Sequence, residues 1–296
     1  MTEFCAEPLR AMCDRRPVLG ARSPYLRFTR LMLKQAYGAF VVVLLISTCS
    51  SPSSSQSRYR LSASPDAWLA PVTFTATVGA YLFSRSTPQL SLTDLAALDK
   101  SNITSFDRWA TDFSSLSIRR GSDVALGISV ALPLLILSEF DADFLHLAGM
   151  YAETIALTWS VTSFIKTSGR IRPLAYNPEA PLSDRQSGDM RESFPSGHAS
   201  ASMAAMVFLA TVYESYRPGT TMSKILWIGG IGLGLTTGSL RIFSGMHFPT
   251  DVLAGAVIGA AIGYIVPKRH ETGSVATIGT TLGPNAAPIL CFTIPL

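Results

Sequence analysis

Six apolar blocks separated by polar segments constrain the fold of this chain more than any other feature of its sequence. They cover roughly residues 67–83, 122–138, 144–165, 199–214, 222–241 and 249–267. A helix needs about 20 mostly apolar residues to cross a membrane. Only 15% of the residues are charged, against about 25% in soluble domains. We therefore predict an all-α bundle of six transmembrane helices, with the buried helices of a soluble all-α domain as the alternative.

The region before these blocks has the order of a targeting sequence. Residues 1–35 are polar and basic, Ala36 to Ile46 are apolar, and a serine-rich run continues to Ser57. This order predicts a signal peptide or a signal anchor, and Met32 is an alternative start. We divide the chain into an N-terminal segment (1–56), a membrane domain (57–268) and a C-terminal tail (269–296).

Two further segments outside the apolar blocks have recognisable patterns. Residues 274–278 and 289–294 of the tail are β-prone and flank a Gly-Pro-Asn turn, which predicts either a short hairpin or a disordered tail. Leu90 to Leu98 has spaced leucines, which are typical of a short helix on a membrane surface or of an amphipathic turn in a soluble segment.

Charge and cysteine content argue against two classes of function. The net charge is only +4, and basic residues are not interleaved with aromatic ones, so no nucleic-acid partner is expected. Cys5, Cys13, Cys49 and Cys291 have neither zinc-ligand spacing nor the spacing of a disulfide framework.

Three polar clusters stand at the ends of apolar blocks. They are Lys166 to Pro173 after the third block, Phe194 to His198 before the fourth, and Ser239 to Asp251 between the fifth and sixth. Because successive spans alternate in direction, all three clusters fall on one face of the membrane. Their chemically active side chains are Lys166, Arg172, His198, Arg241, His247 and Asp251. Three cations beside two imidazoles and one carboxylate suit a phosphate group, since arginine offers a planar fork of donors to its oxygens.

The second cluster also predicts an anion site made by backbone atoms. Ser196 is a plausible N-cap of the helix that starts near Ala199, and its hydroxyl can donate to a ligand. Gly197 allows the backbone to approach a ligand closely. Free N–H groups and the positive end of the helix dipole would then face the phosphate.

The third cluster supplies a candidate nucleophile. His247 and Asp251 are four residues apart, and Pro249 is expected in the first helical turn, so the carboxylate can reach an imidazole nitrogen and fix the tautomer. The other nitrogen would attack phosphorus and His198 would protonate the leaving oxygen. Lys166, Arg172, Arg241 and the helix N-terminus would stabilise the transition state, and water would then hydrolyse the phosphohistidine.

These clusters resemble the three signature motifs of the type 2 phosphatidic acid phosphatase family, written Lys-x6-Arg-Pro, Pro-Ser-Gly-His and Ser-Arg-x5-His-x3-Asp. The second motif is complete. In the third, Leu240 stands where serine is usual. In the first, only five residues separate Lys166 from Arg172. One residue turns a helix by about 100°, so either a local bulge restores Lys166 or Arg170 takes its place.

The resemblance implies a six-span helical bundle with a metal-free, cofactor-free histidine site. It implies hydrolysis of a lipid phosphate or an isoprenoid diphosphate as the activity. A non-catalytic lipid-phosphate binder or transport component on the same scaffold is the second hypothesis. A vanadate-dependent haloperoxidase is the third, and the membrane blocks argue against it.

Basic residues away from the clusters predict the orientation in the membrane. Arg217, Lys224 and Lys268-Arg269 lie at the opposite block ends, and the positive-inside rule places them in the cytoplasm. The clusters then face the periplasm, if the protein resides in a bacterial inner membrane. A cleaved signal peptide conflicts with this topology of the first span.

Three further features complete the predictions. Residues 174–193, between the first two clusters, are expected to form the rim that selects the substrate. Glu153 inside the third block is a candidate functional carboxylate, although a hydrogen bond within the bundle is the favoured interpretation. His270 is interpreted as a flanking charge.

Overall fold

The structure of the chain is a computed structural model that describes residues 58–59, 69–140, 143–271, 277–282 and 288–293. The predicted signal segment, the alternative start at Met32 and the first three cysteines lie outside these residues. All elements below belong to the unit Ala39–Leu296.

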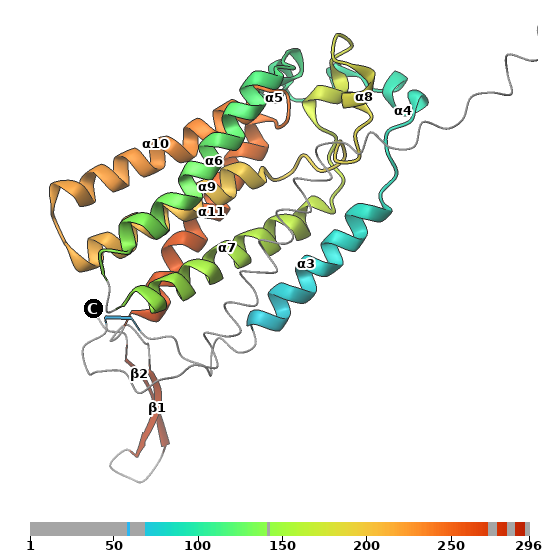
Figure 1. Cartoon of the computed structure of the whole chain (residues 1–296). Coiled ribbons are helices and arrows are strands. Elements are labelled where there is room, and N and C mark those ends of the chain that lie inside the picture. Colours follow the sequence, from blue (N-terminus) through green and yellow to red (C-terminus); the bar gives the residue numbers. More distant parts are fainter. Residues whose placement is uncertain (1–57, 60–68, 141–142, 272–276, 283–287, 294–296) are drawn as a thin grey trace, which may run out of the picture. The chain divides into compact units, whose positions relative to one another are not determined.

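Six helices of 18 to 23 residues correspond one to one with the six apolar blocks (Figure 1). They are α3 (Leu69–Ser86), α6 (Leu116–Leu137), α7 (Phe144–Lys166), α9 (Gly197–Tyr216), α10 (Thr221–Phe243) and α11 (Pro249–His270). Three of them, α6, α10 and α11, are long and apolar enough to cross a membrane. The helical fold and the membrane character are confirmed, while a count of six spans stays a prediction.

Helix α9 is the central helix of this bundle. It packs against α6, α7, α10 and α11, while α3 packs on α7. Almost every residue of α9 from Ala199 to Tyr213 is buried. Small side chains dominate its first half, so neighbouring helices approach closely there.

Three glycines set the contact between α9 and α11. Gly255, Gly259 and Gly263 recur every four residues and therefore lie on one face of α11. A Cβ atom built on Gly259 would lie 2.1 Å from the carbonyl oxygen of Ser200. Backbone thus meets backbone here, and the start of α9 is held against the start of α11.

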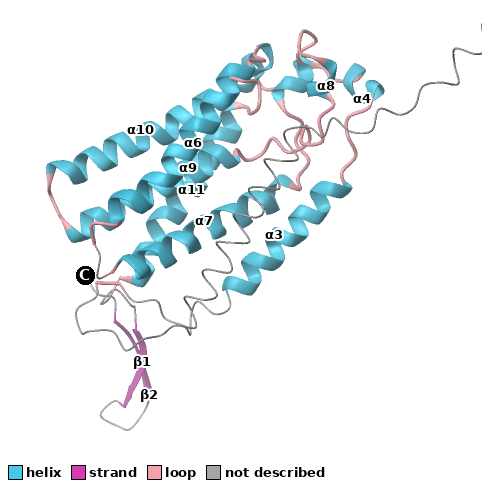
Figure 2. Cartoon of the chain, in the orientation of Figure 1, coloured by secondary structure: helices cyan, strands magenta, loops and turns pink. Residues whose placement is uncertain are grey.

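The short elements gather with the loops near one end of the long helices (Figure 2). They are α4 (Leu92–Ala96), η1 (Lys100–Asn102), α5 (Ser105–Arg108), η2 (Trp109–Asp112), η3 (Pro173–Tyr176) and α8 (Leu182–Arg185). Leu90 and Leu95 are buried in a cluster with Leu174, Met190 and Met246. The segment with spaced leucines therefore packs its apolar side against the loops that carry the motifs.

Two strands follow α11. β1 (Thr277–Leu282) pairs antiparallel with β2 (Pro288–Thr293), with Thr277 opposite Thr293 and Leu282 opposite Pro288. This hairpin occupies the tail for which the sequence left both a hairpin and disorder open.

The interpretation of His270 as a flanking charge is wrong. Its side chain is buried and its Nε2 lies 2.8 Å from Oε2 of Glu153. The last turn of α11 packs against α7, so the histidine is enclosed instead of solvated. Glu153 makes the favoured interhelix hydrogen bond, and the pair satisfies two polar groups inside the bundle.

Candidate functional site

The three polar clusters come together where α7 and α10 end and where α9 and α11 begin. Backbone hydrogen bonds connect their loops directly. The amide of Arg172 donates to the carbonyl of Met190 (2.9 Å), that of Leu174 to Gly245 (2.8 Å), and that of Ser196 to Asp251 (3.0 Å). Gly245 has φ +73°, and a Cβ there would lie 2.1 Å from the carbonyl oxygen of Phe113, so the turn between α10 and α11 requires glycine.

The start of α9 has the features of an anion site. Ser196 is the N-cap and its hydroxyl accepts from the amide of Ala199, as predicted. Gly197 is the first helical residue, and a Cβ atom there would lie 3.8 Å from Cε of Lys166. The Lys166 side chain therefore extends to this helix start, and its Nζ donates to the carbonyl of Glu192 (2.6 Å).

His247 is buried and its tautomer is fixed by a backbone carbonyl. Nδ1 lies 2.7 Å from the carbonyl oxygen of Ser193, so Nδ1 donates and Nε2 keeps its lone pair. Nε2 lies 3.5 Å from Nη1 of Arg172. Burial, followed by the charges of Arg172 and Lys166, lowers the pKa of His247 well below its ordinary value of 6.5. The ring is therefore neutral at pH 7.

The expected hydrogen bond between Asp251 and His247 is not formed. Oδ2 of Asp251 lies 3.7 Å from Nδ1 of His247, although the two residues are one helical turn apart. That oxygen accepts instead from the hydroxyl of Ser193 (2.5 Å) and the amide of Phe248 (2.8 Å). Pro249 begins α11 as predicted. The Asp251 carboxylate caps the first turn of α11 and also binds Ser193, whose carbonyl orients the His247 ring.

Arg170, the alternative to Lys166 in the first motif, contacts a different set of residues from Lys166. Its Nη1 donates to Thr250 and Asp251, and its Nη2 lies 2.7 Å from Oδ2 of Asp107. Its guanidinium also lies over the ring of Phe248, 4.4 Å from the centroid. Two carboxylates already neutralise this cation, so we infer that Arg170 braces the start of α11.

Arg172 is buried and faces both the candidate nucleophile and a carboxylate. Its Nε donates to the carbonyl of Asp189 (2.8 Å) and its Nη2 lies 3.2 Å from Oδ2 of the same residue. Its Nη1 donates to the carbonyl of Met246 (3.2 Å). The loop predicted to select the substrate thus contacts the predicted phosphate ligand through Asp189.

His198 and Arg241 share a partner that sequence reasoning missed. Oδ1 of Asp123, on α6, lies 2.8 Å from Nε2 of His198 and 3.5 Å from Nη1 of Arg241. The neighbouring hydroxyl of Ser122 lies 3.2 Å from the same Nη1. An aspartate inside an apolar helix was the only available signal, because no local motif surrounds it.

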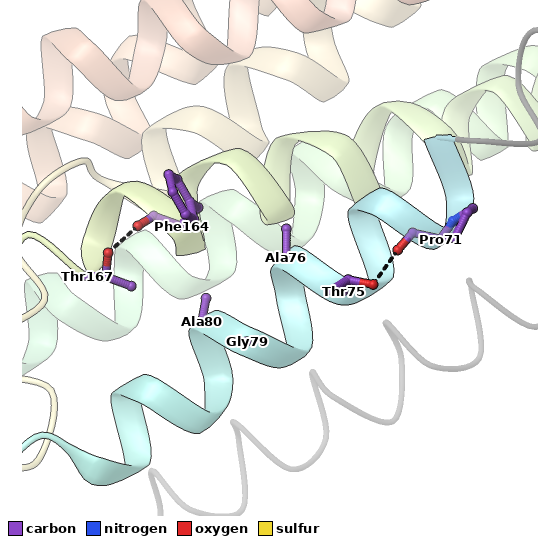
Figure 3. Close-up of a pocket in the computed structure, with 7 residues that line it drawn as sticks. All are labelled: Pro71, Thr75, Ala76, Gly79, Ala80, Phe164 and Thr167. Atoms are coloured by element: carbon purple, nitrogen blue, oxygen red, sulfur yellow. Dashed lines mark hydrogen bonds between the residues drawn. The ribbon is translucent and has the colours of Figure 1, made fainter.

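A shallow apolar groove of about 700 Å³ runs between α3 and α7 (Figure 3). The Thr75 hydroxyl donates to the carbonyl of Pro71 and that of Thr167 to Phe164, so both polar groups are satisfied within their own helices. The groove ends at Thr167, the residue after Lys166. It is lined by Pro71, Thr75, Ala76, Gly79, Ala80, Phe164 and Thr167.

Comparison with known proteins identifies relatives of this chain. The profile of the PAP2 superfamily matches residues 147–273. A lipid A 4'-phosphatase of Bacteroides thetaiotaomicron is 31% identical over 128 residues, which are 39% of this chain and 52% of that protein. An undecaprenyl-diphosphatase of Sulfolobus acidocaldarius is 31% identical over 86 residues, which are 29% of this chain and 37% of that protein. The matches thus span about half of the first relative and less of the second.

A crystal structure of a transmembrane PAP2-type phosphatidylglycerolphosphate phosphatase from Bacillus subtilis is also similar. The TM-score is 0.42 at 17% identity, over 66% of this chain and 93% of that chain. The profile match includes all three polar clusters and the helices α9, α10 and α11 that position them. The similarity to the PAP2 superfamily therefore lies in residues 147–273, the part of the chain that carries the three polar clusters.

Proposed function

We propose that this protein is a membrane phosphatase that hydrolyses a lipid-linked phosphate monoester or diphosphate through a phosphohistidine on His247. The observation that carries the proposal is the orientation of the buried imidazole. Its Nδ1 donates to Ser193, so the lone pair of Nε2 is available beside the guanidinium of Arg172. A neutral, oriented nitrogen next to a cation is the arrangement that nucleophilic attack on a phosphate requires.

The neighbouring groups suit the remaining steps. Arg172 lies 3.5 Å from Nε2, and Lys166 extends to the start of α9. Together with the N–H groups at that helix start, they would stabilise the charge of the transferring phosphoryl group. His198 would donate a proton to the leaving oxygen as the P–O bond breaks. It would then accept a proton from the water that attacks the phosphohistidine, which releases inorganic phosphate and frees Nε2.

A lipid substrate is supported by the surroundings of the site. Two relatives are named for lipid substrates, lipid A and undecaprenyl diphosphate. The groove between α3 and α7 is lined in part by Thr167, the residue after Lys166, and it offers an apolar surface to a hydrocarbon chain. Arg217 and Lys268 lie at the C-terminal ends of α9 and α11, whereas the site lies at the N-terminal ends of these two helices. By the positive-inside rule, the site of a bacterial inner-membrane protein would then face the periplasm.

The proposal is tested with the full chain purified in detergent and a panel of substrates. The panel contains a diacylglycerol phosphate, undecaprenyl diphosphate, lipid A and a water-soluble phosphate ester, and phosphate release is measured for each. We expect turnover of at least one lipid at a kcat/KM above that of the soluble ester. Binding of the lipids without phosphate release from any of them would instead establish a non-catalytic binder and overturn the proposal.

Asp189 supplies a prediction about how phosphate enters the site. Burial opposes its ionisation, yet the adjacent Arg172 holds the pKa of its carboxyl below the ordinary value, so it is an anion at neutral pH. Its carboxylate therefore competes with phosphate for Nη2 of Arg172. Asp189→Asn should tighten inhibition by inorganic phosphate about fivefold, which corresponds to about 1 kcal/mol of removed repulsion.

The control for this measurement is Asp184→Asn, which removes an exposed carboxylate from the same loop. It should leave the inhibition constant of phosphate unchanged. If Asp189→Asn instead weakens phosphate binding, Asp189 positions Arg172 and does not compete for it.

A further inference from the structure

Helix α6 lies outside the three sequence motifs and before the segment 147–273 that matches the superfamily, yet it contacts two of those motifs. Its Asp123 contacts the general acid candidate His198 and also Arg241, at the distances given above. Ser122, fully buried beside it, contacts Arg241 as well. One turn of α6 thus joins the second motif to the third.

The contact between Asp123 and His198 affects which ring nitrogen of His198 can exchange a proton with the substrate. Asp123 faces Nε2 of His198, so Nδ1 is the ring nitrogen that remains for a substrate oxygen. A carboxylate on one imidazole nitrogen orients the ring and stabilises its protonated form. The other charges that face this pair are cations, which disfavour a protonated imidazole. They are Arg241 from α10, Arg119 from α6 and Arg172 from the loop after α7. The buried position of the ring disfavours the protonated form as well, and the Asp123 carboxylate acts in the opposite direction.

We propose that Asp123 is a positioning residue that orients His198 and stabilises the protonated form of its ring, so that Nδ1–H donates its proton to the leaving oxygen. In this step His247 Nε2 bonds to phosphorus, the bond to the leaving oxygen breaks, and the Nδ1 proton moves to that oxygen. His198 becomes neutral and retains its Nε2–H bond to Asp123. Nδ1 then takes a proton from the attacking water. This inference rests on the proposed phosphatase function.

A purely structural role is the competing explanation, because Asp123 also neutralises Arg241. The two roles differ in how they depend on the leaving group. An alkoxide needs a proton as it departs, whereas p-nitrophenolate is stable enough to leave without one. A positioning role for His198 therefore affects lipid phosphates selectively, whereas displacement of Arg241 affects both kinds of substrate equally.

The experiment compares kcat/KM of wild type and Asp123→Asn on a diacylglycerol phosphate and on p-nitrophenyl phosphate, in the full chain in detergent. This parameter reports the steps up to leaving-group release. We expect a loss of about 10²-fold on the lipid, as for removal of general acid assistance, and a loss below about threefold on the aryl ester. Asp123→Glu, which keeps the charge, should restore most of the activity on the lipid.

Two controls make the outcome decisive. Asp112→Asn, at an aspartate whose side chain is 68% exposed, should change neither substrate. Ser122→Ala removes the contact to Arg241 and a hydrogen bond to the carbonyl of Arg119 in the same helix, but leaves Asp123 in place. It should reduce both activities equally if it reduces either. Equal losses on both substrates for Asp123→Asn, or no loss, would overturn the inference. If wild type turns over neither substrate nor any other phosphate ester, the proposed function itself fails. If Asp123→Asn does not fold, the same comparison with Asp123→Ser decides: unequal losses support the role and equal losses refute it.

Discussion

Replacing His247 with alanine should lower phosphate release by at least about 10³-fold, the scale observed when a covalent nucleophile is removed. The reason is that no other group can take its place. Arg172 beside it is a cation, Nζ of Lys166 donates to the carbonyl of Glu192, and Nε2 of His198 faces Asp123. The measurement is kcat on the best lipid substrate of the panel, with the folded fraction of each preparation determined by size-exclusion chromatography.

The matched control for this change is His146→Ala. His146 lies near the beginning of α7, one helix length away from Lys166 and the site. Its replacement should leave kcat within about twofold of wild type, as for most substitutions outside a site. Retention of more than a tenth of the wild-type rate by His247→Ala would exclude His247 as the nucleophile.

Gly259→Leu should prevent the bundle from assembling, and this is the largest expected effect on stability. A Cβ atom at Gly259 would lie 2.1 Å from the carbonyl oxygen of Ser200 and 2.9 Å from its carbonyl carbon. Backbone atoms cannot rotate away as a side chain does, so α9 and α11 must separate. Overpacking of this kind costs about 1–3 kcal/mol and at times more, and the larger leucine adds to it.

The consequence should extend to activity, because the same two helices carry the site. His198 lies in the first turn of α9, and the amide of Ser196 donates to the carbonyl of Asp251 at the start of α11. Even Gly259→Ala, with a smaller loss of thermal stability, should therefore reduce kcat. Gly232→Ala on α10, where a Cβ meets nothing within 4 Å, is the control and should match wild type. Equal thermal midpoints for both alanine variants would refute this account of the α9–α11 contact.

Much of the architecture could be predicted because its causes are local. Each apolar block became one helix, and Ser196 and Pro249 mark helix starts through their own backbone preferences. The alternation of helix direction then brings the three clusters to one end. Lys166 extends to this end as well, although the first motif is one residue short, because its side chain is long enough to reach Gly197.

The contacts that could not be predicted join residues distant in the sequence. Asp123 and His198 are 75 residues apart, and Glu153 and His270 are 117 apart. A single carboxylate in a helix carries no pattern that identifies its partner. The spacing of His247 and Asp251 indicated a hydrogen bond, but a 2.7 Å bond to the Ser193 carbonyl takes its place. That carbonyl is positioned by the loop before α9, whose path depends on tertiary packing.

The central claim is that phosphate passes through a covalent bond to Nε2 of His247. Rapid acid-free quenching of the full chain with a radiolabelled lipid phosphate tests it most directly, followed by peptide mapping of the label. The account predicts a label on the peptide containing His247 that is stable in alkali, is lost in acid and is absent from His247→Ala. Turnover without any trapped label under single-turnover conditions, or a label that persists in His247→Ala, would contradict it.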